Sequence, residues 1–303
     1  MSHSSSAREE LRQGGVRGAS LRAFLWTACF AVAATGCSSC TRGLPRGGLI
    51  QDPARITTVL TERASRVRAL RAHGSADQFG RNGRVRGEVA IRVRAPDKVR
   101  FDMFAFGQLV SSLVTNGSQF GLLQGQQYLV GPARACAAQQ IAGIPLEARE
   151  IAAVLSGGVP VIGAPVGPVR WEEGHYVLDL RSTEGNTARI ELELPSDQDA
   201  LAPSRQSPRV TRVVLRDGRG PRADIRYEGY RLVEGEAFPE RVRVLMERDD
   251  VDMQVRFDRI ELGEPPAPTQ PVDDPLADEN PAPAQDPFAI GAPAGATLVP
   301  VDC

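Results

Sequence analysis

Histidine and lysine are scarce in this chain of 303 residues, which contains three histidines and a single lysine, Lys98. A general acid or base that works near neutral pH is most often a histidine, so this shortage counts against catalysis of that kind. Three histidines and five cysteines also leave little material for a metal site. The formal net charge of −1 argues against a general nucleic-acid binder, which usually carries a clear basic excess.

Sequence signatures of catalytic and cofactor sites are missing as well. The chain has no G-x-S-x-G elbow, Walker loop, H-E-x-x-H motif or dinucleotide fingerprint. His73 and His175 are expected in solvated turns. The group Asp249, Asp250 and Asp252 lacks the glycine and the distant glutamate of a calcium loop and is expected in a hairpin turn. We therefore predict that the protein is not an enzyme and holds no cofactor and no metal.

An apolar run is present near the N-terminus, at residues 21–36, behind a polar stretch that contains several arginines. A basic segment, an apolar segment of about a dozen residues and small residues before the cleavage point are the parts of a secretory signal. The run is too short for a membrane span of about 20 residues. Its end, Ala34-Thr35-Gly36-Cys37, resembles the lipobox of bacterial lipoproteins.

The lipobox resemblance implies that Cys37 becomes the acylated N-terminus of the mature chain and anchors the protein in a bilayer. Ser38 stands where Asp would favour the inner membrane, so it favours the outer membrane, with the protein on the periplasmic face. An ordinary signal peptide that happens to end beside a cysteine is the alternative.

Hydrophobic periodicity in the rest of the chain predicts a helix followed by many strands. Residues 55–72 contain no Gly or Pro and repeat apolar residues at helical spacing, so we expect an amphipathic helix that Gly74 ends. Residues 84–94 alternate Val or Ile with Arg and Glu, which indicates an antiparallel sheet with one solvated face. A second helix is predicted at residues 146–155. Further strands are predicted at residues 99–103, 109–115, 119–130, 169–181, 187–194, 209–216, 223–227, 240–247 and 252–262, with a hairpin turn at Asn116-Gly117.

Composition divides the chain into five segments. We predict a lipoprotein signal peptide at 1–36, a lipidated tether at 37–54, one mainly β domain at 55–263, a Pro-rich linker at 264–287, and a C-terminal strand at 288–303. The last segment regains apolar character and is expected to return to the sheet, where Pro300 keeps it at an edge.

The cysteines predict one disulfide. With Cys37 assigned to lipid, the mature chain retains Cys40, Cys136 and Cys303 in an oxidising compartment, where thiols tend to pair. Cys40 lies in the tether, and its partner stays open. Cys136 and Cys303 both lie beside strand-like segments, so we predict that they pair and hold the terminal strand in place.

The order of these elements resembles the LolA/LolB lipoprotein-carrier superfamily, with the closer likeness to LolB, an outer-membrane lipoprotein that receives other lipoproteins. The matching stretches are residues 99–107, 109–123, 144–155, 227–230 with the chain from Pro239 onward, and 288–299. The resemblance implies an α+β, mainly β fold, in which a curved antiparallel half-barrel is closed by amphipathic helices. It also implies an apolar cavity for the acyl chains of lipoproteins or another lipid, and a periplasmic LolA-like carrier as a candidate partner.

Site residues follow from this resemblance and from the alternation. The expected cavity wall comprises Val89, Ile91, Val93, Phe101, Met103, Leu113 and Leu122, and the expected lid comprises Val59, Leu60, Val67, Ile151 and Leu155. In LolB-like proteins an apolar residue projects from a loop between two strands and delivers cargo to the bilayer. The matching loop here contains Phe104, Phe106 and Gly107, with Ala105 in place of the usual Pro, so Phe106 is the candidate for membrane insertion. A Phe106 folded back into the core is the alternative.

The sequence thus predicts a monomeric lipoprotein, anchored at the outer membrane, that binds acyl chains and acts in lipoprotein reception, lipoprotein insertion or lipid transport. The alternative is a structural or assembly lipoprotein of the same fold. That protein would have a filled interior and would bind a protein partner through the Arg-rich outer face of its strands.

Overall fold

The computed structural model describes residues 43–80, 83–160, 163–263 and 286–303. The predicted signal peptide, the lipidation site Cys37, Cys40 and most of the Pro-rich linker lie outside the described residues. The described residues all belong to one compact unit. No helix in the described ranges is both long and apolar enough to cross a bilayer.

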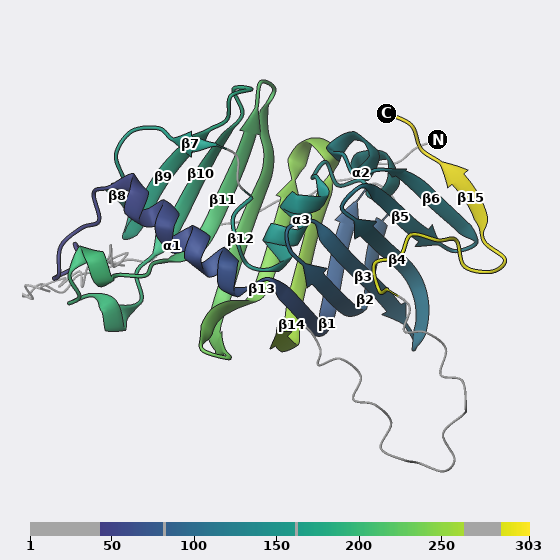
Figure 1. Ribbon diagram of the computed structural model, residues 1–303, viewed down its shortest axis with the longest axis horizontal. Helices are drawn as coiled ribbons and strands as arrows, with labels where there is room; N and C mark the ends of the chain where they lie inside the picture. Colours follow the sequence, from purple (N-terminus) through teal and green to yellow (C-terminus); the bar gives the residue numbers. More distant parts are fainter. Residues whose placement is uncertain (1–42, 81–82, 161–162, 264–285) are drawn as a thin grey trace, which may run out of the picture. The chain divides into compact units, whose positions relative to one another are not determined.

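A curved, open antiparallel β-sheet makes up most of this unit (Figure 1). Its strand order is β15-β6-β5-β4-β3-β2-β1-β14-β13-β12-β11-β10-β9-β7, with β8 paired to β9. The strands are β1 (Ala69–Gly80), β2 (Gly83–Arg94), β3 (Lys98–Ala105), β4 (Gln108–Asn116), β5 (Gln119–Gln124), β6 (Gln127–Pro132), β7 (Ala164–Pro165), β8 (Arg170–Glu172), β9 (His175–Arg181), β10 (Thr187–Glu193), β11 (Arg209–Asp217), β12 (Gly220–Val233), β13 (Glu236–Met246), β14 (Val251–Leu262) and β15 (Thr297–Pro300). The predicted fold class, a mainly β chain with a curved antiparallel sheet and few helices, is confirmed.

Three α-helices in the described residues lie against the sheet (Figure 1). α1 (Pro53–Arg66) crosses β9 to β13, α2 (Ala135–Ala142) packs on β5 and β6, and α3 (Ala148–Leu155) packs on β2 and β3. The side chain of Asp52 caps α1 by accepting a hydrogen bond from the Ala54 amide, and Pro53 occupies its first turn. Glu147 and Glu150 form a capping box at the start of α3. Short 3-10 helices lie at Ser196–Gln198, Pro203–Arg205 and Glu247–Asp249.

The predicted helix at residues 55–72 is wrong in its second half. The helix ends at Arg66, and β1 begins at Ala69. Gly74 does not end a helix but lies at a register shift within β1, where a Cβ atom would come 1.9 Å from the carbonyl oxygen of Arg256. Small residues occupy most inward positions of β1, so apolar side chains show only a weak two-residue alternation there. The larger apolar side chains are spaced as in a helix, which is why the sequence predicts one.

Other boundaries differ for local reasons. The predicted strand at residues 119–130 is two strands, β5 and β6, joined at Gly125, whose φ is positive. α2 was not predicted, because Ala and Gln fill it and Ile141 is its one large apolar residue. The helix predicted at residues 146–155 begins at Ala148, after the Glu147 cap.

The folded part also begins before the predicted boundary at residue 55. Pro45 and Ile50 are buried. The Gln206 side chain, itself buried, donates a hydrogen bond to the carbonyl oxygen of Gly48 at 2.9 Å and accepts one from the Tyr176 hydroxyl. Residues 45–50, predicted as part of the tether, therefore pack against the sheet domain.

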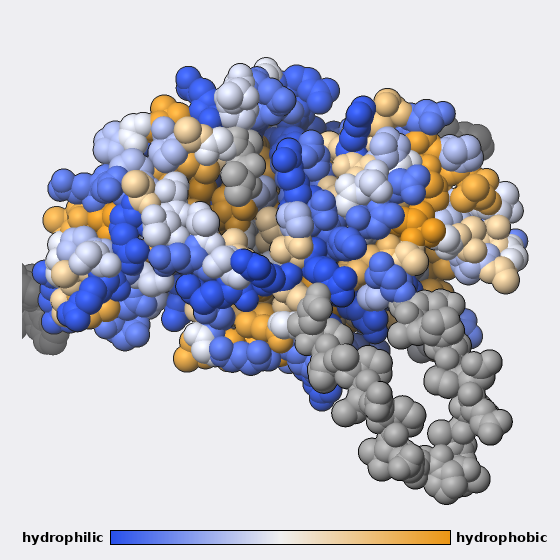
Figure 2. Space-filling view, viewed as in Figure 1, coloured by the Kyte–Doolittle hydropathy of each residue, from blue (hydrophilic) through white to orange (hydrophobic). Residues whose placement is uncertain are grey.

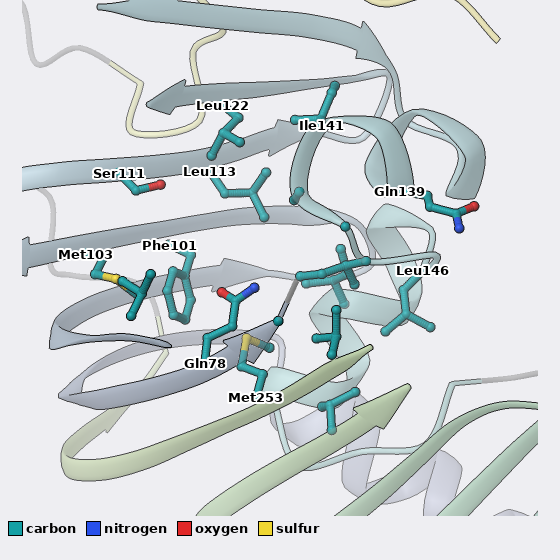
Figure 3. A pocket seen from close by; sticks show the side chains of 18 of the residues that line it. Gln78, Phe101, Met103, Ser111, Leu113, Leu122, Gln139, Ile141, Leu146 and Met253 are labelled. Carbon is teal, nitrogen blue, oxygen red and sulfur yellow. The ribbon is translucent and has the colours of Figure 1, made fainter. Parts of the chain in front are cut away.

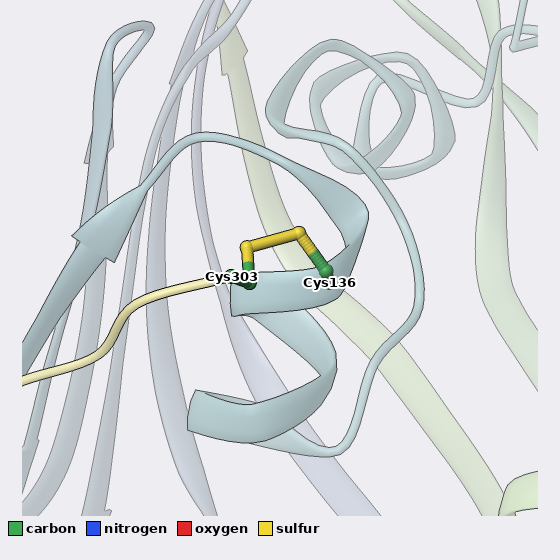
Figure 4. Close-up of a disulfide and its surroundings, with 2 residues drawn as sticks. All are labelled: Cys136 and Cys303. Carbon is green, nitrogen blue, oxygen red and sulfur yellow. A yellow bond between two sulfur atoms is a disulfide. The ribbon is translucent and has the colours of Figure 1, made fainter.

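The C-terminal segment is held at both ends. Phe288 is buried, with the Arg94 guanidinium 5.4 Å from its ring centre, and Tyr128 accepts a hydrogen bond from the Gly291 amide. β15 then pairs in parallel with β6 at the sheet edge, where Pro300 was expected. The chain ends in a disulfide between Cys303 and Cys136 of α2, with the two Cα atoms 6.1 Å apart (Figure 4).

Candidate functional site

A cavity of about 630 Å³ lies between the sheet and the helices α2 and α3 (Figure 3). This volume falls in the range of roughly 300–1,000 Å³ that is usual for small-molecule sites. The sheet side of the wall comes from β1 to β6, β13 and β14. The helix side comes from α2, α3 and the segment between them.

The lengths of the elements explain why this space is open. α2 and α3 have eight residues each, which is about 12 Å of helix. β1, β2 and β14 have 12 residues each, which is about 40 Å of strand. The two short helices therefore cover only part of these strands. The uncovered part ends at the hairpin turns β1–β2, β3–β4, β5–β6 and β13–β14, which antiparallel pairing places at one end of the sheet.

The cavity wall is mainly aliphatic and thioether in character. Strand residues that line it include Phe101, Met103, Leu113, Leu122 and Met253, and helix-side residues include Ile141, Leu146, Ile151 and Leu155. Figure 3 shows Gln78 beside Phe101 and Met253. Burial of apolar ligand surface against such a wall is favourable by about 25 cal/mol for each Å² removed from water.

Six of the residues predicted to line the cavity do so. They are Phe101, Met103, Leu113, Leu122, Ile151 and Leu155. Whether these six contact acyl chains stays a prediction.

The other six predicted cavity residues do not line it. Val89, Ile91 and Val93 on β2 are buried in the packed core, because α3 lies against β2 and β3. Val59 and Leu60 belong to α1, which covers a different part of the sheet, and Val67 follows that helix in the core. Alternation identified inward-facing positions correctly but did not show which of them a helix covers.

Sequence reasoning missed several lining residues. Ile141 and the glutamines of α2 lie on a helix that was not predicted. Val251, Met253 and Val255 belong to a strand that was predicted but was not assigned to the wall. The alternation of apolar residues in β14 was the available signal, and only the pairing of β14 with β1 brings it beside the cavity.

The predicted insertion loop is the two-residue turn between β3 and β4. Phe106 and Gly107 both have positive φ, 51° and 74°, and the Phe106 side chain is fully exposed. A phenylalanine is unfavourable in this left-handed conformation, where Asn or Gly is usual. Because the Phe106 side chain is exposed, the alternative of a Phe106 folded back into the core is wrong. Phe104 is half-buried and pairs with Leu109.

Exposed apolar residues continue beside this turn. Leu109 and Val110 at the start of β4 are 41% and 38% exposed, and Phe79 and Val85 of the β1–β2 hairpin are each 47% exposed. These residues lie at the same end of the sheet as the turns that surround the cavity. Figure 2 shows hydrophilic residues over most of one face of the molecule, with smaller hydrophobic patches between them.

A buried polar seam joins α1 to the end of α3. The Arg63 guanidinium donates hydrogen bonds to the carbonyl oxygens of Gly157 at 2.6 Å, Ala237 at 3.2 Å and Ser156 at 3.3 Å. Burial lowers the pKa of Arg63 and raises the pKa of Tyr227, whose hydroxyl donates to the Gly158 carbonyl at 2.6 Å. These groups hold the backbone at a helix end, and none of them is among the described residues that line the cavity.

The outward face of the sheet carries Arg–carboxylate pairs from strand to strand. Glu172 pairs with Arg170 and Arg189, and hydrogen bonds from these two guanidiniums hold the pKa of its carboxyl below the usual range. Arg243 holds the pKa of Asp252 down in the same way. Carboxylates therefore neutralise these outward arginines.

The polar residues considered for catalysis lie on strands or turns. His73 is exposed within β1, not in the predicted turn, and His175 begins β9. Asp249 and Asp250 form the predicted hairpin turn before β14. Among the described residues, no group of three or more His, Cys, Asp or Glu side chains is placed to hold a metal ion.

Together, the fold and the cavity define a class of protein: an open, curved, mainly β sheet with a mostly apolar cavity under short helices. No family model matches the sequence, and no curated protein sequence does.

Solved structures do resemble the fold. A LolA superfamily protein from Nitrosomonas europaea has 11% identity and a TM-score of 0.43 over 70% of this chain and 94% of that one. A putative outer membrane lipoprotein-sorting protein domain from Vibrio parahaemolyticus has 8% identity and a TM-score of 0.41 over 70% and 93%. A DUF1329 family protein from Desulfovibrio piger has 8% identity and a TM-score of 0.46 over 73% and 94%.

Proposed function

We propose that this protein binds the acyl chains of a lipoprotein or another lipid in the cavity under α2 and α3, and acts in lipoprotein reception or lipid transport. The observation that carries the proposal is the cavity itself, about 630 Å³ with a largely apolar wall, which ends at the hairpin turns of the sheet. Apolar burial supplies most of the affinity, and this proposal requires no cofactor.

The lipobox resemblance at Cys37 supports a place on the periplasmic face of the outer membrane, because an acylated N-terminus keeps the protein at a bilayer. LolA-type lipoprotein carriers are then the candidate donors of cargo. Lipoprotein sorting is also part of the description of one similar structure, from Vibrio parahaemolyticus.

The cavity is tested by filling it. Leu122 lines the cavity, whereas the adjacent Leu123 points to the opposite face of β5 and is half-buried. The full chain, produced in a bacterial envelope and purified in non-ionic detergent, is examined by native mass spectrometry for lipid that co-purifies. Leu122→Trp should lose the bound lipid, and Leu123→Trp should keep it.

Thermal unfolding of both variants separates loss of the cavity from loss of the fold. The proposal is overturned if the unaltered protein carries no lipid and takes none up from added acyl-chain probes.

Phe106 is proposed to enter the acyl boundary of the membrane when cargo is passed on. Its full exposure in a conformation that disfavours phenylalanine supports this role, because a solvent-exposed turn has no structural need for that side chain. Phe106→Asn should weaken binding of the cargo-free protein to lipid vesicles, whereas Leu232→Asn, a change at another exposed apolar residue, should not. Equal vesicle binding by all three proteins would remove the role of Phe106.

A further inference from the structure

Five glutamines line the cavity, and we call them the glutamine rim: Gln78, Gln124, Gln127, Gln139 and Gln140. They come from β1, from both sides of the β5–β6 turn and from α2. Gln124 and Gln127 lie directly opposite each other in the β5–β6 ladder. The apolar wall therefore changes to carboxamide groups close to the hairpin turns.

Most of these carboxamides have no hydrogen-bond partner among the described residues. The Gln139 side chain donates a hydrogen bond to Asp249 at 2.7 Å. In the described part of the chain the other four carboxamides form no hydrogen bond with another residue. A carboxamide both donates and accepts hydrogen bonds and carries no charge, so the rim matches ester carbonyls, amides and hydroxyls.

Positively charged side chains are missing from the described part of the same lining. Among its described residues there is no Lys or Arg, and the single ionisable side chain is the carboxylate of Asp249. Gln78 is half-buried and the other four rim glutamines are exposed, so a head group at the rim stays in contact with water. A phosphate or carboxylate head group there would find no charge-assisted hydrogen bond from the described lining residues, and it would meet the like charge of Asp249.

We propose that the glutamine rim selects acyl-chain ligands whose polar group is uncharged and bears hydroxyl, ester or amide groups, such as a diacylglycerol or the acylated cysteine of a lipopeptide. Anionic lipids with the same chains are disfavoured. This inference rests on the proposed function and adds the chemical class of the ligand's polar group.

The test compares ligands with identical chains and different polar groups. The full chain, in non-ionic detergent, is titrated with dipalmitoylglycerol, a neutral triacylated cysteinyl peptide amide, or dipalmitoylphosphatidylglycerol, in competition with a fluorescent acyl probe. We expect each neutral lipid to compete at least about tenfold better than the anionic lipid, since charge-assisted partners are missing. The two neutral lipids distinguish a glyceride from a lipopeptide as the source of the ligand.

Charge substitution in the rim provides the second arm. Gln124→Lys should improve competition by phosphatidylglycerol about tenfold and leave the acyl probe bound. Gln119→Lys is the matched control, because Gln119 is exposed on β5 and does not line the cavity. The charge of Arg81, which lies outside the described residues, is tested separately. Arg81→Gln should keep the preference for neutral lipids.

The outcomes separate the two proposals. If the acyl probe binds and the neutral and anionic lipids compete with it equally well, the role of the rim is overturned and the proposed function stands. Loss of the neutral preference in Arg81→Gln, or the same gain for Gln119→Lys as for Gln124→Lys, also overturns the rim. No binding of any acyl probe overturns the proposed function and the rim together.

Discussion

Two regions of one sheet meet their helices in different ways. Under α1, the strands β9 to β12 present large side chains that fill the interface, among them Tyr176, Leu178, Ile190, Leu215 and Ile225, each at most 1% exposed. Under α2 and α3, the inward residues Met103, Leu113 and Leu122 are also mostly covered, but they border a cavity of about 630 Å³.

Helix length is the main physical difference between the two regions. α1 has 14 residues and spans several strands, whereas α2 and α3 have eight each and cover strands of 12 residues incompletely. Similar sheet faces thus give a filled interface in one region and an open cavity in the other. A second, smaller hollow of about 240 Å³ lies beside Trp171 at the far end of the α1 region.

The largest effect should come from matched truncations in the two regions. Leu215→Ala removes a fully buried side chain and should lower the free energy of unfolding by about 3–5 kcal/mol. Leu113→Ala should cost about 1–2 kcal/mol, because its side chain already borders open space and leaves a smaller new void. Chemical denaturation measures both values. Equal losses in the free energy of unfolding for the two variants would show that side chains fill the cavity in solution.

Removal of the disulfide should weaken the cavity region alone. Cys136 and Cys303 are 167 residues apart, and a disulfide typically stabilises a protein by about 2–4 kcal/mol. Cys303→Ser should speed amide hydrogen exchange in α2 and β15 and leave β10 to β12 unchanged. Faster amide exchange throughout the sheet would show that the region under α2 and α3 does not unfold independently of the region under α1.

Arg63 connects the two regions, so its loss should be felt in both. Arg63→Met leaves the carbonyl oxygens of Ser156, Gly157 and Ala237 without their donor, which should cost about 2–3 kcal/mol. Arg66→Met is the control, because Arg66 pairs with Glu236 at an exposed position. Denaturation curves of equal midpoint for the two variants would deny Arg63 this role.

Acid should destabilise the outward face of both regions. The pKa values of Glu172 and Asp252 are held below their ordinary values by hydrogen bonds from arginines. Groups with depressed pKa values in the folded state stabilise it above their unfolded pKa values and lose that effect as pH falls through the folded ones.

The free energy of unfolding should therefore be nearly constant above about pH 5 and fall below about pH 4. Asp252→Asn should flatten part of this slope by up to about 1 kcal/mol, as for one partly exposed pair. An unchanged slope in urea titrations at several pH values would rule out this pair as a contributor.

The smallest effect should be a gain in stability at the β3–β4 turn. Phe106→Asn replaces a phenylalanine that has positive φ with a residue that tolerates this conformation, and should stabilise the cavity region by about 0.5–1 kcal/mol. The thermal midpoint measures it. A lower midpoint would show that Phe106 packs on the protein in solution.

Strand patterns were the most informative part of the sequence. The alternation at residues 84–94 and 240–247 predicted β2 and most of β13 with their inward faces, and Asn116-Gly117 marked the β4–β5 turn. The prediction failed where side chains are small or weakly patterned, as in β1 and α2. Half of the predicted cavity residues were misplaced for a different reason, since the position of each helix over the sheet depends on contacts between distant segments.

The amino-acid pattern alone was sufficient for the mainly β class, the inward side of most strands and the pairing of Cys136 with Cys303. Alternation reports which side chains avoid water, and it is the same whether a helix or an empty space lies opposite them. The position of the cavity, its rim of glutamines and the placement of Phe106 beside it were settled by tertiary structure. These features depend on how far short helices extend over long strands, which is a property of packing between segments distant in the sequence.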